Sequence, residues 1–139
     1  MNKTLNTVYE TSFVVYPRHV NCRSPLIFGG AFFSEMDICA ATVVKRFLYD
    51  SKTAKSAVTH KFEGTFLKPC YMGNLIFLDA RITSVGVKSV VVEVKAYRDT
   101  EAGQELVAEA NFVFVTVAND DTVEDKPDKL PYHPHGLTL

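Results

Sequence analysis

One carboxylate in this sequence lies among apolar residues, where a charged side chain is unusual. Asp37 lies in the run LIFGGAFFSEMDICAA, residues 26–41, which is almost wholly apolar. Burying a charge without a partner costs free energy. Asp37 therefore either pairs with a group such as Arg18, Arg81 or a loop amide, or lies at the edge of a cavity where an ionised carboxylate takes part in a reaction. The sequence leaves both interpretations open.

Backbone amides form the second chemical feature. Gly29 and Gly30 stand where a helix is expected to begin, and the N–H groups of a first helical turn are free to meet an oxyanion or a phosphate. A tight turn also explains the two glycines, and no Lys-Ser or Lys-Thr follows them as a P-loop requires. His19 and Asn21 precede them in a loop, where a solvated histidine and a turn-forming asparagine are the simpler interpretation. No Ser-His-Asp or Cys-His arrangement is recognisable.

The element that positions Asp37 is expected to be a long helix. Residues 31–49 contain no proline or glycine, and their length favours a helix over a strand. At about 100° per residue, Asp37 falls at the far border of the apolar stripe, about two turns past the glycines and too deep to cap the helix. The opposite, polar face consists of Glu35, Cys39, Thr42 and Arg46. Because Glu35 shares that face with Arg46, its side chain is expected to be solvated.

Strand patterns occupy the rest of the expected domain. β-branched and aromatic residues predict a first strand over 8–16, which stops at a proline. After the helix the period changes to two, and alternation over 57–68 places Thr59 on the face opposite Phe62. Three further strands are predicted over residues 75–85, 88–98 and 105–117. The four later strands are interpreted as an antiparallel meander, which gives an α+β fold with a curved antiparallel sheet wrapped around one long central helix.

Length and composition set the domain organisation. The chain has 139 residues, enough for one domain, which we assign to residues 1–118. Residues 119–139 have no period and are rich in Asp, Lys, Pro and His, so they are expected to form a polar tail on the surface. His133 and His135 flank a proline in this tail and could hold a metal only weakly.

Charge and cysteine content exclude several classes of function. Charged residues are 22% of the chain and the net charge is −1, which gives no electrostatic case for binding nucleic acid or an anionic membrane. The three cysteines are odd in number and widely spaced, so they suit neither a disulfide framework nor a zinc site. With no signal-peptide pattern and no apolar run of about 20 residues, the protein is expected to be soluble and cytoplasmic.

Several of these features together resemble a known family. Asn21, then Phe28-Gly29-Gly30, then Ser34-Glu35-Met36-Asp37 resemble the hotdog-fold acyl-CoA thioesterases of the cytosolic acyl-CoA hydrolase type. The resemblance continues through Val58-Thr59, Phe66-Leu67-Lys68-Pro69, Gly86 with Ser89, and Lys126-Pro127 with Leu130-Pro131. Two departures are visible. Asn21 lies one residue farther from Gly29 than is usual in the family, and Ser24-Pro25 replaces an expected glycine between them.

The resemblance implies a fold, a reaction and a set of site residues. It implies a hotdog fold and hydrolysis of acyl-CoA to a free acid and coenzyme A, with no metal and no cofactor beyond the coenzyme A of the substrate. Asp37 would activate water or attack the thioester, and the Gly30 N–H would polarise the carbonyl. Asn21 of one subunit would face Asp37 of another, so a homodimer or a larger assembly is implied. The residues expected to contact substrate are Phe28, Gly29, Thr59, Lys88 and Ser89.

Two other functions remain open at this level. A hotdog hydratase or dehydratase would pair His19 with Asp37, although the proline-spaced histidine motif of such dehydratases is absent. A non-catalytic acyl-binding or oligomeric hotdog module would keep Asp37 for a structural role. A DNA-binding regulator is disfavoured because no basic region or helix-turn-helix is attached. The length of the acyl chain, and the choice between coenzyme A and a carrier protein, cannot be derived from the sequence.

Overall fold

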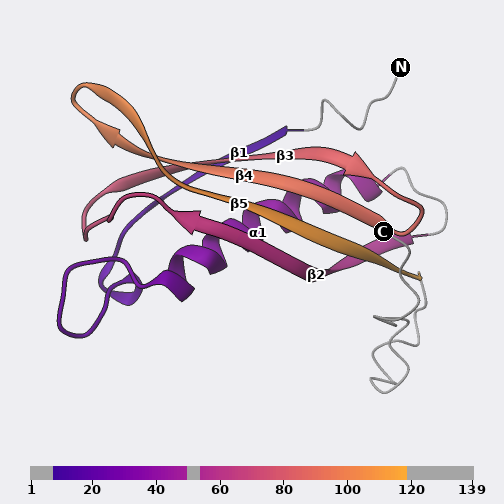
Figure 1. Cartoon of the computed structure of the whole chain (residues 1–139), viewed down its shortest axis with the longest axis horizontal. Helices are drawn as coiled ribbons and strands as arrows, with labels where there is room; N and C mark the ends of the chain where they lie inside the picture. Colours follow the sequence, from indigo (N-terminus) through magenta and orange to yellow (C-terminus); the bar gives the residue numbers. More distant parts are fainter. Residues whose placement is uncertain (1–7, 50–53, 119–139) are drawn as a thin grey trace.

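The predicted helix and strands are present in the structure, a computed structural model that describes residues 8–49 and 54–118 (Figure 1). In chain order the elements are β1 (Val8–Val14), a 3-10 turn η2 (Pro17–His19), α1 (Gly29–Leu48), β2 (Ala54–Phe66), β3 (Leu75–Val85), β4 (Ser89–Thr100) and β5 (Gly103–Ala118). The predicted tail, with His133 and His135, lies outside the described residues. Within the described ranges, no helix combines the length and apolar character needed to cross a membrane.

The strands form one antiparallel sheet that curves around α1. Its strand order is β1-β3-β4-β5-β2, and every neighbouring pair is antiparallel. In Figure 1 the helix runs along the length of the sheet, and all five strands contact it. The predicted α+β class, with a long central helix wrapped by a curved antiparallel sheet, is confirmed.

The predicted meander is correct for only three of the four later strands. β3, β4 and β5 follow one another as hairpins, but β2 pairs with β5 instead of β3 and lies at the far edge of the sheet. The chain after β2 crosses to the opposite edge, where Gly73 N–H donates to the Val15 carbonyl and Val15 N–H donates to the Asn74 carbonyl, at 2.8 and 2.9 Å. β3 therefore begins beside the end of β1. Alternation identifies a strand but does not report which neighbour it pairs with.

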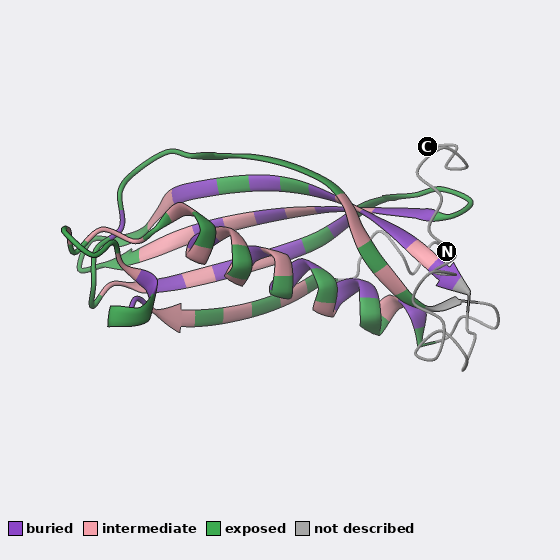
Figure 2. Ribbon diagram, turned by 90° about the horizontal axis from the view of Figure 1, so that it is seen from below, coloured by how far each residue is buried: buried purple, intermediate pink, exposed green. Residues whose placement is uncertain are grey.

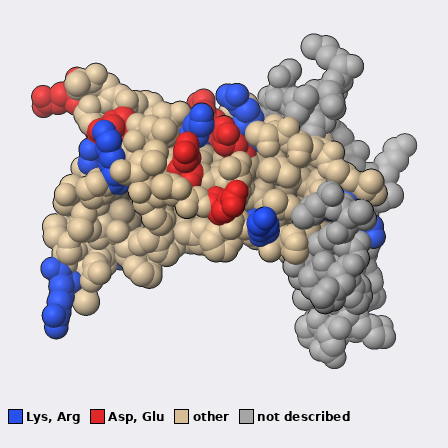
Figure 3. Space-filling view, in the orientation of Figure 1, with Lys and Arg blue, Asp and Glu red and all other residues tan. Residues whose placement is uncertain are grey.

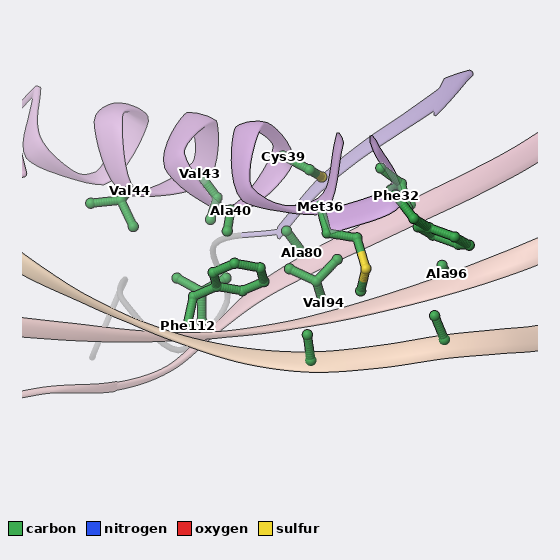
Figure 4. Close-up of a cluster of buried hydrophobic side chains, with 14 of the residues drawn as sticks. Phe32, Met36, Cys39, Ala40, Val43, Val44, Ala80, Val94, Ala96 and Phe112 are labelled. Carbon is green, nitrogen blue, oxygen red and sulfur yellow. The ribbon is translucent and has the colours of Figure 1, made fainter. Parts of the chain in front are cut away.

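The core lies between α1 and the concave face of the sheet. In Figure 4 Phe32, Met36, Ala40 and Val43 project from α1 toward side chains of the strands, including Val94 and Phe112. All of these are at most 2% exposed. Figure 2 shows buried and exposed positions alternating along the helix, as an amphipathic helix on a sheet requires.

The prediction that Cys39 belongs to a polar helix face is wrong. Cys39 is 1% exposed, and its thiol lies 3.8 Å from the carbonyl oxygen of Tyr9 on β1. The curved sheet covers more of the helix circumference than one apolar stripe, so β1 closes over a face that the wheel assigned to solvent. Charges lie on the other face of the sheet, where Glu93, Lys95 and Glu109 alternate with buried residues of β4 and β5. Figure 3 shows acidic and basic side chains gathered across one side of the molecule.

Candidate active site

The Asp37 carboxylate lies at the border between α1 and the edge strand β2. The side chain is half-buried, and its Oδ1 accepts a hydrogen bond from the Thr59 hydroxyl at 2.8 Å. The arginine partners considered from the sequence are elsewhere, since Arg81 is exposed on β3 and Arg18 lies over the Tyr16 ring. None of the ion pairs among the described residues includes Asp37. The carboxylate is therefore held by a neutral donor and not by a guanidinium.

A β-bulge in β2 brings Thr59 to the helix. Thr59 is paired with Phe114 and Lys61 with Val113, so His60 is an extra residue in β2. As a result Thr59 and Phe62 both face α1, and the centroid of the Phe62 ring lies 4.2 Å from that of the Phe33 ring on the helix. Strict alternation placed Thr59 and Phe62 on opposite faces, and that prediction is wrong. No glycine or proline at this point of the sequence marks the bulge.

The first turn of α1 presents uncapped amides. Phe28 is the N-cap residue and makes no side-chain cap hydrogen bond. A Cβ on Gly30 would lie 2.9 Å from the Phe28 ring, so a residue without a side chain allows this aromatic ring to lie against the helix start. Backbone N–H groups and the positive end of the helix dipole are therefore directed at the space around Gly29 and Gly30.

An apolar pocket of about 320 Å³ opens beside this first turn. It lies between α1 and β2, and its walls include Gly29, Gly30, Phe33, Met36, Phe62 and Phe66. Gly64 belongs to the same wall, where a Cβ would lie only 2.8 Å from the Cβ of Ala110 on β5. A pocket with few polar groups, next to exposed amides and one residue from Asp37, suits an apolar chain that carries a carbonyl at its end.

Asn21 is not part of this grouping within one chain. It is exposed in the loop before α1, where its N–H donates to the Leu26 carbonyl and its Oδ1 accepts from the Arg23 N–H, at 3.1 and 3.4 Å. These bonds remain inside the loop. The structure therefore joins Asp37 with Thr59 and not with Asn21.

Lys88 and Ser89 also lie apart from Asp37. They are at the turn between β3 and β4, where Lys88 is exposed and Ser89 is 5% exposed. Ser89 pairs with Val115, which pairs with Val58 on β2, so a whole strand separates them from Thr59. Their predicted contact with substrate stays a prediction.

His19 and Glu35 form a pair that the sequence did not indicate. His19 is 3% exposed, and its Nε2 lies 3.2 Å from Oε1 of Glu35, whose side chain is 28% exposed. The prediction of a solvated Glu35 on the face of Arg46 is wrong, because the loop before α1 folds back over this part of the helix. His19 consequently points to Glu35, and not to Asp37 as a hydratase would require.

The two buried thiols, Cys39 and Cys70, are not placed for nucleophilic chemistry. Desolvation by burial, with a smaller contribution from the Asp79 charge, raises the pKa of the Cys39 thiol to about 12. Burial also raises the pKa of Cys70. Both thiols stay protonated and unreactive near neutral pH. Over residues 8–49 and 54–118, no group of three or more His, Cys, Asp or Glu side chains is placed to hold a metal ion.

Comparison with known proteins identifies the family. Residues 25–105 match the model of the thioesterase superfamily. The chain belongs to this superfamily. The acyl-CoA thioester hydrolase YciA of Salmonella typhimurium is 31% identical over 111 residues, which cover 76% of this thioesterase and 77% of the relative, and YciA of Escherichia coli is 32% identical over the same length.

Solved structures show the same fold. The hexameric thioesterase y2039 from Yersinia pestis has 28% identity and a TM-score of 0.68, and the match covers 81% of this thioesterase and 87% of that chain. An acyl-CoA hydrolase from Staphylococcus aureus, solved with butyryl coenzyme A and coenzyme A, has 23% identity and a TM-score of 0.72, over 85% and 69% of the two chains. The family and the hotdog fold inferred from the sequence are confirmed.

Proposed function

We propose that this thioesterase hydrolyses acyl-CoA to a free acid and coenzyme A. The observation that carries the proposal is the Asp37 carboxylate, held by the Thr59 hydroxyl without a cationic partner among the described residues, beside an apolar pocket onto which the first turn of α1 opens. The relatives named acyl-CoA thioester hydrolases support the choice of substrate, as does the Staphylococcus aureus neighbour solved with coenzyme A ligands.

The reaction follows from the chemistry of these groups. The acyl chain occupies the pocket, and the thioester oxygen lies at the Gly30 N–H, where the helix N-terminus stabilises the negative charge that develops on attack. Asp37 either takes a proton from the attacking water or attacks the carbonyl carbon itself, and water then hydrolyses the anhydride so formed. In both routes the carbon–sulfur bond breaks, and the coenzyme A thiolate leaves and takes up a proton. Thr59 keeps Asp37 oriented by donating to its Oδ1.

We place the complete site between two copies of the chain. β2 is an edge strand, and it leaves Phe62 and Phe66 each 55% exposed in the wall of the pocket, so a second copy would cover this apolar surface. Asn21 of that copy would then face Asp37, and Lys88 and Ser89 would lie toward the coenzyme A end of the substrate. The hexameric Yersinia pestis thioesterase supports a homo-oligomer. The free state of Cys22, Cys39 and Cys70 supports a reducing, cytosolic location.

The test is hydrolysis of a panel of acyl-CoA esters, with a thiol reagent to detect released coenzyme A. Asp37→Asn keeps the size of the side chain and removes the base, so kcat/KM is expected to fall by about 10²–10⁴-fold. Asp99→Asn is the matched control, because Asp99 is exposed at the end of β4 and should be dispensable. Undiminished turnover by Asp37→Asn would contradict the proposal.

The same panel separates the other two functions. The hydratase alternative requires His19→Ala to abolish hydration of an enoyl thioester while Asp37→Asn leaves hydrolysis intact, and the contact of His19 with Glu35 disfavours it. Tight binding of acyl-CoA without any turnover would indicate the non-catalytic module.

A further inference from the structure

A buried histidine beside the site has both ring nitrogens engaged, and the proposed reaction does not use it. The Nδ1 of His19 accepts a hydrogen bond from the backbone N–H of Tyr16 at 2.9 Å, and its Nε2 lies 3.2 Å from Oε1 of Glu35. The ring packs against Phe13 with centroids 5.3 Å apart, and the residue is 3% exposed. Because buried polar atoms are costly when unpaired, the two bonds together hold the ring in one orientation.

The two partners of His19 fix its tautomer. A backbone N–H can only donate, so Nδ1 must offer a lone pair to Tyr16. The ring proton of a neutral imidazole is then on Nε2, from which it is donated to the carboxylate of Glu35. A second proton on Nδ1 would face the N–H of Tyr16 and remove that hydrogen bond. The geometry therefore selects the neutral ring with its proton on Nε2.

His19 also closes the loop that carries Asn21. The carbonyl oxygen of His19 accepts a hydrogen bond at 2.7 Å from the N–H of Phe28, the N-cap residue of α1. Immediately inside this bond, Val20 and Ile27 pair as an isolated antiparallel bridge. The bond between His19 and Phe28 therefore closes the base of the loop and ties the segment that carries Asn21 to the start of α1.

Glu35 connects this closed loop to the helix. It lies on α1 five residues after Gly30 and two residues before Asp37. Its bond to His19 therefore joins the loop to the segment of helix that carries both the first-turn amides and the carboxylate.

We propose that His19 and Glu35 are positioning residues, which hold the Asn21 loop and the start of α1 in the geometry that hydrolysis requires, with His19 in the Nε2–H form. This inference rests on the proposed function. Neither residue is assigned a contact with substrate, since both nitrogens of His19 already have protein partners. Loss of the pair misplaces groups that act in the transition state, so it lowers kcat more than it raises KM.

The kinetic test uses two substitutions of Glu35 in the full chain. Glu35→Leu removes the acceptor at similar size, and kcat is expected to fall about 10- to 100-fold with KM changed by no more than about twofold. Glu35→Gln keeps an oxygen that can accept from His19 and is expected to restore most of that kcat. The matched control is Glu93→Leu, since Glu93 lies on β4 across the sheet and its side chain is 38% exposed, against 28% for Glu35.

Two kinetic outcomes would overturn the proposal. Each variant is assayed at a temperature well below its midpoint of thermal unfolding, and circular dichroism checks that it is folded. A Glu35→Leu protein with a lower midpoint but unchanged kcat would show that the pair only stabilises the fold. A Glu35→Gln protein as slow as Glu35→Leu would show that the hydrogen bond is not what matters.

A spectroscopic test does not depend on turnover. In protein labelled with ¹⁵N at histidine, the His19 signals, identified by their absence from His19→Asn, are expected to show a proton on Nε2 and none on Nδ1 at the pH of the assay. A proton on Nδ1 would overturn the assigned tautomer. If the wild-type protein hydrolyses no acyl-CoA, the proposed function fails, and the spectrum still decides the state of the pair separately.

Discussion

Asp37 and Cys39 are two residues apart on α1 and face opposite edges of the sheet. Cys39 faces β1, is 1% exposed and lies 3.8 Å from the Tyr9 carbonyl oxygen. Asp37 faces β2, is half-buried and accepts a hydrogen bond from Thr59. Burial raises the pKa of the thiol to about 12, which keeps it inert. The side of α1 that faces β1 is thus buried, and we term it the sealed side. The side that faces β2 borders the pocket, and we term it the open side.

The difference originates in the edge strands. On the β1 side the rings of Phe13 and Phe32 meet edge to face, with centroids 6.0 Å apart, and close the core. On the β2 side the bulge at His60 presents a hydroxyl, and Gly64 supplies no side chain, so a pocket remains. Two titratable groups only two residues apart on one helix therefore differ in burial because different edge strands cover them. The comparison can be tested on each side separately.

Neighbouring phenylalanines on α1 give the largest expected contrast. Phe32 is 1% exposed on the sealed side, whereas Phe33 is half-buried and lines the pocket. Phe32→Ala is expected to lower the free energy of unfolding by about 3–5 kcal/mol, the usual cost of emptying a buried aromatic site. Phe33→Ala should cost less, because part of its ring already faces open space. Urea denaturation measures both, and equal losses would contradict the division into two sides.

The hydroxyl on the open side gives the next effect. Thr59→Val removes the donor to Asp37 at nearly constant shape, and a hydrogen bond to a charged group contributes about 1.5–3 kcal/mol, so kcat/KM is expected to fall about tenfold or more. Thr42→Val is the control, since the Thr42 hydroxyl donates to the Ile38 carbonyl of its own helix at 2.8 Å. If both variants lose the same activity in steady-state assays, the bond from Thr59 has no special role.

Thiol reactivity tests the sealed side. Cys22 is exposed, whereas Cys39 and Cys70 are buried with raised pKa values. A disulfide reagent at about pH 8, near the ordinary pKa of a free thiol, is expected to modify Cys22 rapidly in the native protein and the other two only after unfolding. Cys22→Ala should therefore abolish the rapid phase. A rapid reaction that instead disappears in Cys39→Ala would show that the β1 side is open.

The smallest expected effect concerns acid stability. Hydrogen bonds from Lys68 and then Arg98 hold the pKa of Glu105 below its ordinary value of 4.5, and Arg98 also donates to the Pro69 carbonyl at 2.9 Å. Because the folded pKa is lowered, this stabilisation is present above pH 4.5 and is lost as the pH falls through the folded value. Glu105→Gln should therefore flatten the acid side of a plot of thermal midpoint against pH. An unchanged slope would contradict the linkage.

Local patterns were enough to predict the elements and the position of Asp37. The run from residue 31 to 49 without proline or glycine predicted α1, and alternation predicted β3 at 75–85 with the observed bounds. The helical wheel placed Asp37 at the border of the apolar stripe, where the structure has it. These features depend on the order of nearby residues, which the sequence shows directly.

Contacts between distant segments could not be predicted. The pairing of β2 with β5 depends on how the loop after Phe66 crosses the sheet. The bond between His19 and Glu35 depends on a loop that folds back over the helix, and the wheel contains no information about it. The family resemblance supplied Thr59 as a site residue, whereas alternation alone placed it on the face opposite Phe62.

The extra residue in β2 makes the site sensitive to chain length as well as to residue type. Thr59 reaches Asp37 because four residues of β2, 59 to 62, lie opposite only three residues of β5, 112 to 114. Deleting His60 would restore strict two-residue alternation and turn the threonine outward, with every side chain assigned to the reaction still encoded. Redesign of this edge, or transfer of the site to a related scaffold, must therefore conserve the residue count of the strand and not only its polar side chains.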